Sequence, residues 1–369
     1  MAIKVLSVFG TRPEAIKMAP VVQELTRYPD RIVSRVCVTA QHREMLDQVL
    51  DLFGIVPDYD LNVMRPNQSL AELTANILAR LDGVIAGERP DWVLVQGDTT
   101  TAMVGGLAAF YRRVKVGHVE AGLRTQDKWQ PFPEEINRRV AGVIADAHFA
   151  PTAWARDNLL REGVSPQRVF VTGNPVIDAL LQVAGKPFDV TSGPLAGVPW
   201  EKRIVAVTAH RRENFGRPLE QICAALLEVA RRYADDVHLV YPVHLNPNVQ
   251  EPVYRLLGDT PNITLLPPLD YLPMVQLIKR AYMLLTDSGG LQEEAPGLGK
   301  PVLVLRGNTE RPEAVQAGTV KLVGADAEVI VGEACRLLDD AHVYAQMARA
   351  VNPYGDGHAA GQIVRVLLS

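Results

Sequence analysis

The sequence contains little cysteine: Cys37, Cys223 and Cys335 are the three in 369 residues. They lie far apart and form no CxxC pair, which argues against a disulfide scaffold or a cysteine-based zinc site. An odd number of scattered cysteines is typical of a protein from a reducing compartment. The sequence therefore predicts a cytoplasmic protein.

Long apolar runs and basic runs are also missing. No apolar run reaches the roughly 18 residues that a membrane-spanning helix needs, and the first nine residues hold one lysine and too short an apolar segment for a signal peptide. The net charge is −4. We therefore expect a soluble protein that has neither a membrane nor a nucleic acid as its partner.

Several cofactor-binding motifs are absent. The chain has no GxGxxG dinucleotide fingerprint and no GxxxxGK[ST] loop. Its eight histidines are scattered, and none shows ligand spacing with another histidine or a cysteine. His118, near the end of a predicted strand, and Glu120, just after it on the same side, do not make a metal site by themselves. We expect no metal and no cofactor.

What is present is a regular alternation of short β-branched runs and amphipathic segments. Continuous apolar strands that alternate with helices predict parallel sheets covered by helices on both faces. Helices are expected at 15–28, 69–86, 134–144, 219–233 and 326–338. Strands are expected at 3–9, 32–38, 92–96, 114–119, 168–172, 203–208, 237–243, 262–266, 282–286, 301–305 and 319–323.

Eleven strands are too many for one comfortable open sheet, so the fold class we predict is α/β with two doubly wound, Rossmann-like domains facing a cleft. A Pro/Gly-rich connector within 173–202 marks the boundary. The predicted domains are residues 1–173 and 174–355, with a helix in 356–369 that crosses back to the first domain. Doubly wound folds bind ligands at the carboxyl ends of their strands.

The most informative segment is 287–295 (DSGGLQEEA), which follows an apolar strand. Ser288, Gly289 and Gly290 precede a helix whose N-terminus can hold a phosphate, because free N–H groups and the positive dipole end point there. Glu294, one turn later, can accept hydrogen bonds from both hydroxyls of a ribose. The segment therefore indicates a nucleotide diphosphate; the alternative is an ordinary helix cap.

The segment 10–17 (GTRPEAIK) also follows a strand. Pro13 suits the start of a helix, and Arg12 and Lys17 could both reach an anion held there. Two solvated cations near a turn are the alternative.

Three carboxylates follow predicted strand ends or begin a helix in the first domain: Asp98, Glu120 and Glu134. Asp98 could instead be a plain helix cap. Glu120 should be partly buried and should need a partner, for which Arg124 and Arg138 are candidates. Several acids around one cleft are what proton transfer on both faces of a sugar carbon requires.

In the second domain, His210 ends a strand and is followed by Arg211 and Arg212. It could donate to a phosphate or a leaving-group oxygen, although a lone histidine is usually structural. His244 lies in a similar but weaker segment, and Arg311 adds a cation near the expected diphosphate.

With these motifs in order, the chain resembles the non-hydrolysing UDP-N-acetylglucosamine 2-epimerases of bacteria almost from end to end. The segments that carry the resemblance are 10–14 (GTRPE), 40–43 (AQHR), 96–100 (QGDTT), 118–124 (HVEAGLR), 209–213 (AHRRE), 287–290 (DSGG) and 352–357 (NPYGDG).

The resemblance implies a glycosyltransferase-B-like fold, usually a homodimer, and an isomerase that interconverts UDP-N-acetylglucosamine and UDP-N-acetylmannosamine for cell-surface polysaccharide synthesis. It implies Asp98, Glu120 and Glu134 as the acid/base group, with His210 beside the leaving group. It implies that UDP and the substrate are held by Arg12, Lys17, Arg138, His210, Met274, Ser288, Gly289, Gly290, Glu294 and Arg311.

Some family members bind a second substrate molecule as an activator. The resemblance places that site at Gln41, His42, Arg65, Arg211 and His244. Three positions depart from the family pattern: Leu269 stands where Gln is expected, Met274 where an aromatic residue is expected, and Glu44 where a Gln is common in the activator site. A base contact through the backbone of Met274 would survive this change.

The chemistry leads to the same reaction. C2 of the sugar has no adjacent carbonyl, so its proton is not acidic enough for direct removal, and oxidation would need a nicotinamide. The cofactor-free route expels UDP from C1, which acidifies C2–H and gives a 2-acetamidoglucal; UDP then adds back. The alternatives are a retaining glycosyltransferase or a hydrolysing epimerase of the same fold, and a non-catalytic nucleotide-sugar sensor. A sensor would be expected to lose the acids at 98, 120 and 134, all of which are present. The sequence does not assign each carboxylate to a face.

Overall fold

The computed structural model describes residues 2–40, 43–65 and 68–369. Two compact units make up the chain: Met1–Ala179 with Tyr354–Ser369, and Leu180–Pro353. The boundary between them falls inside helix α7 (Pro175–Ala184).

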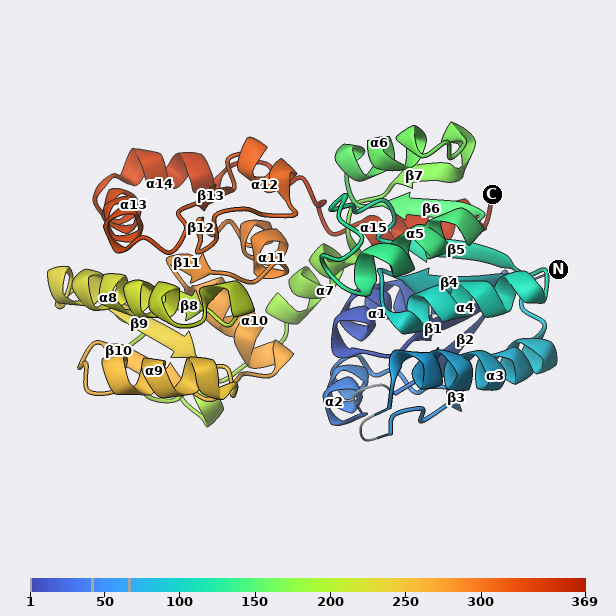
Figure 1. The fold of residues 1–369 in the computed structure, drawn as a ribbon, viewed down its shortest axis with the longest axis horizontal. Coiled ribbons are helices and arrows are strands. Elements are labelled where there is room, and N and C mark those ends of the chain that lie inside the picture. The colour runs from blue at the N-terminus through green and yellow to red at the C-terminus, as the bar shows by residue number, and fades with distance from the viewer. Residues whose placement is uncertain (1, 41–42, 66–67) are drawn as a thin grey trace. The chain divides into compact units, whose positions relative to one another are not determined.

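The first unit is built on a seven-stranded sheet whose paired strands are all parallel, with the strand order β3-β2-β1-β4-β5-β6-β7. Helices α3, α4 and α5 pack side by side, as do α1, α2 and α15, so both faces of the sheet are covered (Figure 1). The strands are β1 (Ile3–Phe9), β2 (Ile32–Val38), β3 (Tyr59–Asp60), β4 (Trp92–Gln96), β5 (Lys115–Val119), β6 (Ala147–Ala150) and β7 (Val169–Val171). The helices are α1 (Arg12–Thr26), α2 (Arg43–Phe53), α3 (Leu70–Glu88), α4 (Thr100–Tyr111), α5 (Glu134–Ile144), α6 (Ala153–Arg161), α7 and α15 (Ala359–Leu367).

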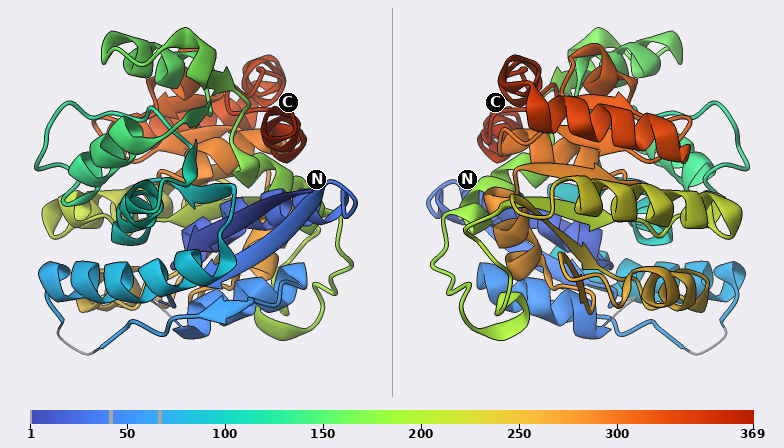
Figure 2. Two further views of the ribbon diagram at one scale, coloured as in Figure 1. Left: turned by 90° about the vertical axis from the view of Figure 1, so that its right-hand side faces the viewer. Right: turned by 90° about the vertical axis from the view of Figure 1, so that its left-hand side faces the viewer.

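The second unit has a six-stranded parallel sheet in the order β10-β9-β8-β11-β12-β13. Helices α8, α9 and α13 share one apolar core with the strands. These three helices lie side by side (Figure 2). The strands are β8 (Arg203–Thr208), β9 (Val237–Pro242), β10 (Ile263–Leu266), β11 (Met283–Thr286), β12 (Val302–Val304) and β13 (Val320–Leu322). The helices are α8 (Arg217–Arg232), α9 (Pro247–Leu257), α10 (Tyr271–Arg280), α11 (Leu291–Gly297), α12 (Pro312–Gln316), α13 (Ala327–Asp339) and α14 (Ala341–Ala348).

The predicted strands are all confirmed to within one residue at each end. Their continuous apolar character reflects burial on both faces, as parallel sheets require. Two strands were missed. Strand β3 has two residues, and β6 reads Ala-His-Phe-Ala, which contains no β-branched residue.

Among the described residues, no helix is long and apolar enough to cross a membrane. In each sheet the strands all point the same way, so the loops that follow them gather at one edge. Asp98 and Glu120 follow strand ends at this edge of the first sheet, and His210 and Ser288 follow strand ends at this edge of the second.

Candidate functional site

Strands β4 and β5 are neighbours in the first sheet and end in register, with Gln96 opposite Val119. Glu120 follows Val119 directly, and Asp98 lies two residues after Gln96. Parallel strands thus bring two carboxylates that are 22 positions apart in sequence to one edge of the sheet.

Glu120 is held in an unusual conformation. Its backbone φ is 61°, in the left-handed region that non-glycine residues rarely occupy, and its side chain is buried. The carboxylate accepts hydrogen bonds from Lys17 Nζ at 2.6 and 2.7 Å, from Asn174 Nδ2 at 2.8 Å, and from Gln96 Nε2. A buried carboxylate needs such partners because an unpaired charge in the interior is strongly destabilising. Backbone strain of this kind gathers at functional sites.

Asp98 has a different environment. Its carboxylate pairs with the guanidinium of Arg138, and its backbone carbonyl accepts from Asn137 Nδ2 at 3.0 Å. Asp98 is not the cap of α4, because that role belongs to Thr99, whose hydroxyl accepts from Ala102 N at 3.0 Å.

Arg124 and Arg138, the predicted partners of Glu120, form ion pairs with other carboxylates. Arg124 forms its ion pair with Glu162 at 2.7 Å, and Arg138 pairs with Asp98 and with Glu135, the latter at 3.2 Å. Lys17, which we expected at the diphosphate, is the cation that contacts Glu120. Glu120 and Asp98 thus each have a basic partner, Lys17 and Arg138 respectively.

Arg12 and Glu134 stand at the first positions of α1 and α5, and both are partly exposed. Helix α1 begins with a capping box: the Thr11 hydroxyl faces Glu14 N, and Glu14 Oε2 accepts from Thr11 N at 2.8 Å. Glu14 also accepts from Gly10 N at 3.0 Å and from the Thr99 hydroxyl at 2.6 Å. Burial raises the pKa of the Glu14 carboxyl. Glu14 therefore ties the loop after β1 to the loop after β4.

In the second unit, Asp287 follows β11 and is fully buried. Its Oδ2 accepts from His210 N at 2.8 Å, Arg211 N at 2.8 Å and Asn214 Nδ2 at 2.9 Å. It fixes the loop after the neighbouring strand β8, and it lies 3.5 Å from His210 Nδ1. The His210 ring stacks on His244 at 5.4 Å between centroids. Burial lowers the pKa of His210, although Asp287 opposes this effect.

Ser288, Gly289 and Gly290 lead into α11, whose first residue is Leu291. The guanidinium of Arg311 lies against Gly289, where a Cβ atom would come within 2.5 Å of its Nη1. Arg311 contacts Glu293 at 2.6 Å and Glu310 at 2.7 Å. Burial alone would raise the pKa of Glu310, but Arg311 and Arg306 lower it to about 2.

Glu294 is also buried and accepts from the Tyr271 hydroxyl at 2.9 Å. Burial, followed by the Glu294 charge, raises the pKa of Tyr271 well above its ordinary value. Met274 lies in the first turn of α10, where its N–H donates to Asp270 O at 3.0 Å. A base contact through that N–H would compete with the helix.

The family model for UDP-N-acetylglucosamine 2-epimerase matches residues 23–368. A curated UDP-N-acetylglucosamine 2-epimerase of Escherichia coli (strain K12) is 57% identical over 370 residues, covering 99% of this chain and 98% of that protein. The chain belongs to the UDP-N-acetylglucosamine 2-epimerase family. The resemblance that the motifs predicted is confirmed.

Solved structures of this epimerase family have the same fold. The enzyme of Neisseria meningitidis bound to UDP-GlcNAc matches with a TM-score of 0.89 and 50% identity, covering 99% of this chain and all of that chain. A glycotransferase of kitacinnamycin matches with a TM-score of 0.63 at 13% identity, with 99% of each chain covered, which shows the fold alone. The two doubly wound sheets and the glycosyltransferase-B-like class of this epimerase-family chain are confirmed.

The residues predicted for an activator site are distributed over the two units. Gln41 and His42 lie outside the described residues. Arg65 is exposed in the first unit, while the partly exposed Arg211 and the exposed His244 belong to the second. Arg211 lies 3.7 Å from Glu310.

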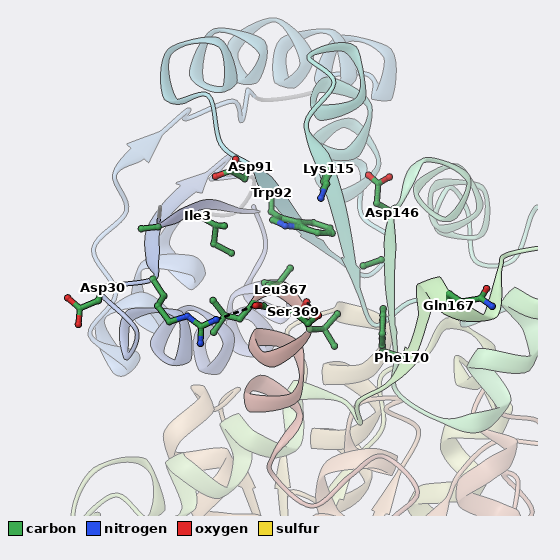
Figure 3. A pocket seen from close by; sticks show the side chains of 15 residues that line it. Ile3, Asp30, Asp91, Trp92, Lys115, Asp146, Gln167, Phe170, Leu367 and Ser369 are labelled. Atoms are coloured by element: carbon green, nitrogen blue, oxygen red, sulfur yellow. Dashed lines mark hydrogen bonds between the residues drawn. The ribbon is translucent and has the colours of Figure 1, made fainter.

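A separate pocket of about 790 Å³ lies at the opposite, amino edge of the first sheet (Figure 3). Ile3, Trp92 and Lys115, which begin three of the strands, line it together with the end of α15. It contains none of the predicted site residues. Across the part of the chain that the structure describes, no group of three or more His, Cys, Asp or Glu residues is placed to hold a metal ion.

Sequence reasoning missed three side chains that shape these edges: Glu14, Asn174 and Asp287. Glu14 had a readable signal, since Thr-x-x-Glu before an apolar run is a capping-box pattern. Asn174 was taken as part of the connector, and Asp287 as part of the phosphate segment. Their partners lie 54 and 76–77 positions away in sequence, so no local pattern reveals them.

Proposed function

We propose that this protein interconverts UDP-N-acetylglucosamine and UDP-N-acetylmannosamine without releasing a free sugar. The observation that carries the proposal is the pair of carboxylates, Asp98 and Glu120, each with its own cation, at one sheet edge of a chain from this family. The relative from Neisseria meningitidis was solved with UDP-GlcNAc bound, which supports the same substrate here.

The reaction begins with loss of UDP. The bond between C1 and the diphosphate oxygen breaks, its electrons leave with UDP, and positive charge develops at C1. Cations stabilise the leaving diphosphate. We assign this role to Arg12, Lys17 and Arg311, with His210 and the 288–290 segment, and we assign the ribose to Glu294.

A carboxylate then takes the proton from C2, and a C1–C2 double bond forms, giving a 2-acetamidoglucal. Protonation of C2 from the opposite face and return of UDP to C1 complete the inversion. Asp98, Glu120 and Glu134 form the group that transfers these protons. We propose that the first unit supplies this group and the second unit binds most of the nucleotide, with Met274 near the base and Arg138 near the sugar.

Lys17 could link diphosphate binding to proton transfer by Glu120. Its ammonium contacts the Glu120 carboxylate at 2.6 Å. A diphosphate that attracts Lys17 would weaken that ion pair and leave Glu120 more available as a base. The same lysine would then couple nucleotide binding to proton transfer.

We also propose that the protein is a cytoplasmic homodimer that supplies a precursor for cell-surface polysaccharide. Phe110 and Tyr111 at the end of α4 and Val143 near the end of α5 are exposed, and these two helices pack side by side. Exposed apolar side chains on adjacent helices are suited to contact a second copy. The activator site at Gln41, His42, Arg65, Arg211 and His244 remains a proposal on the family pattern.

The test is product analysis by NMR after incubation with UDP-N-acetylglucosamine alone in heavy water. We expect UDP-N-acetylmannosamine with deuterium at C2. Free N-acetylmannosamine with UDP would instead indicate a hydrolysing epimerase. Release of UDP that depends on an added acceptor, without deuterium at C2, would indicate a glycosyltransferase.

A further inference from the structure

His118 and the backbone of Gly97 are joined by a hydrogen bond between two neighbouring strand ends. His118 lies on β5, two residues before Glu120, and is fully buried. Its Nε2 is 2.7 Å from the carbonyl oxygen of Gly97, the residue just before Asp98. A carbonyl can only accept, so Nε2 carries the proton.

The ring is neutral in this position. Burial, and to a smaller extent Arg124, lowers the pKa of His118 to about 4. At neutral pH the ring is therefore an uncharged donor whose tautomer is set by the Gly97 carbonyl. It does not carry a charge for the substrate.

The peptide group around Gly97 needs such support. Gly97 has a φ of 68° and begins the turn that carries Asp98. Its N–H donates to Val119 O at 2.9 Å, while its carbonyl accepts from His118. Strand β5 thus holds Gly97 from both sides, and the same strand leads into Glu120.

The Glu120 carboxylate is close to this turn. A Cβ atom on Gly97 would come within 3.3 Å of Glu120 Oε2, and Gln96 donates to the same oxygen. Any shift of the turn therefore alters the spacing between Asp98 and Glu120. Positions of reacting groups matter at this scale, since a 1 Å misplacement can lower turnover by about 10²-fold.

We propose that His118 is a positioning residue, which fixes the Gly97–Asp98 turn through its Nε2–H and thereby sets the spacing of the Asp98 and Glu120 carboxylates. It does not touch the substrate. This inference rests on the proposed function of the two carboxylates.

The chain offers a matched control in His148. It lies directly opposite His118 in the β5–β6 register and is equally buried. Its pKa is also lowered to about 4, chiefly by burial. Its backbone hydrogen bond, however, goes to Ala145 and not to the Asp98 turn. Loss of either ring leaves a similar hole in the same layer of the fold.

The experiment compares His118→Leu with His148→Leu, and His118→Gln with His118→Asn. We expect kcat to fall about 100-fold in His118→Leu, with KM and the Kd for UDP within about threefold. The melting temperature of His148→Leu should fall by about as much as that of His118→Leu. Its kcat should stay within about threefold of the wild-type value. His118→Gln, which still presents an N–H near the Nε2 position, should turn over at least about tenfold faster than the shorter His118→Asn.

Equal losses of kcat in His118→Leu and His148→Leu would overturn the inference, as would an unchanged kcat in His118→Leu. If either Leu variant does not fold, the Gln and Asn pair decides, and equal rates for these two reject the role of the hydrogen bond.

Histidine ¹⁵N NMR separates this inference from the proposed function. The His118 ring should show a protonated Nε2 and stay neutral at pH 5, with its signal assigned by its loss in His118→Gln. A charged ring or a protonated Nδ1 would reject the hydrogen bond whatever the enzyme does. If the ring behaves as expected but the wild-type protein does not epimerise the substrate, the proposed function is wrong while the hydrogen bond from His118 to Gly97 stands.

Discussion

At the strand ends, single side chains combine an unusual backbone conformation with charge pairing. Glu120 combines a left-handed backbone, a buried carboxylate and the ammonium of Lys17. Such a combination is costly for stability, and it is typical of residues selected for chemistry. Asp98 is more exposed and is held by Arg138.

At this scale, we predict that Glu120→Gln lowers kcat by at least about 10²-fold, because general acid–base catalysis contributes about that much. The Kd for UDP should change by less than about tenfold, or roughly 1.4 kcal/mol. Asp98→Asn and Glu134→Gln should behave alike. Turnover assays with UDP titration calorimetry measure both quantities.

Glu162→Gln is the matched control, because Glu162 also pairs with a buried arginine but follows α6 and not a strand end. It should retain turnover. Near-normal turnover in all three carboxylate variants would contradict the acid/base assignment.

The two glycines at 289 and 290 allow a second residue-scale prediction. A Cβ on Gly289 would clash with the end of the Arg311 side chain, while a Cβ on Gly290 would lie 3.6 Å from Glu294, an ordinary contact. Gly289→Ala should weaken UDP binding by about tenfold, with little change in melting temperature because Arg311 can move. Gly290→Ala should bind UDP nearly as well as wild type, and calorimetry compares them. Equal losses in both variants would show that Arg311 does not set the affinity.

Among the elements, helix α1 has a residue with both a local and a distant role. The capping box at its start can be predicted from the sequence. Glu14 of that box also accepts a hydrogen bond from Thr99 in another loop, 85 positions away, which the sequence does not predict. Burial raises the pKa of Glu14 above its ordinary value of 4.5. The folded state therefore binds a proton more readily than the unfolded chain, and this group destabilises the fold increasingly as pH rises from about 4.5 through the raised pKa.

We predict that Glu14→Gln, which lacks this titration, gains stability relative to wild type as pH is raised from 4 to 8. Glu162→Gln is the control with the opposite sign, because the hydrogen bond from Arg124 lowers the pKa of Glu162. Its stability relative to wild type should fall as pH rises over the same range. Urea unfolding at each pH measures both differences. A pH-independent difference for Glu14→Gln would contradict the account.

How far the sequence predicts the elements depends on their length and packing. Helix α5 was predicted at its observed bounds, because a strong amphipathic pattern runs from Glu134 to Ile144. Strand β6 was missed because Ala-His-Phe-Ala contains no β-branched residue, whereas the three-residue strands β7, β12 and β13 were predicted. Partners such as Lys17 for Glu120, 103 positions apart, could not be predicted, since tertiary structure alone brings them together. The left-handed backbone at Glu120 could not be predicted either, because a positive φ is normally expected at glycine and this position holds a glutamate.

At the scale of the whole molecule, the two units hold different chemistry at their strand ends. The first presents carboxylates with their cations, and the second presents small residues with arginines. This division is consistent with a reaction in which one unit binds the nucleotide and the other transfers protons to and from the sugar.

The proposed dimer gives a prediction at the same scale. Light scattering after size exclusion should give a mass about twice the 40.4 kDa of the chain. Val143→Glu on α5 should yield monomers, because a charge placed in an apolar contact is strongly unfavourable. Val351→Glu is the control, since Val351 is equally exposed but lies in the other unit. A monomeric wild type, or a Val143→Glu dimer, would contradict this interface.

Cleavage of the anomeric C–O bond is the central claim, and isotope scrambling tests it most directly. UDP-N-acetylglucosamine would carry ¹⁸O in the oxygen that bridges C1 and the β-phosphorus. If UDP leaves and returns, rotation of the free β-phosphate moves the label into its non-bridging positions, which phosphorus NMR detects. We expect scrambling as the epimers equilibrate. Epimerisation with the label still wholly in the bridge would contradict this claim.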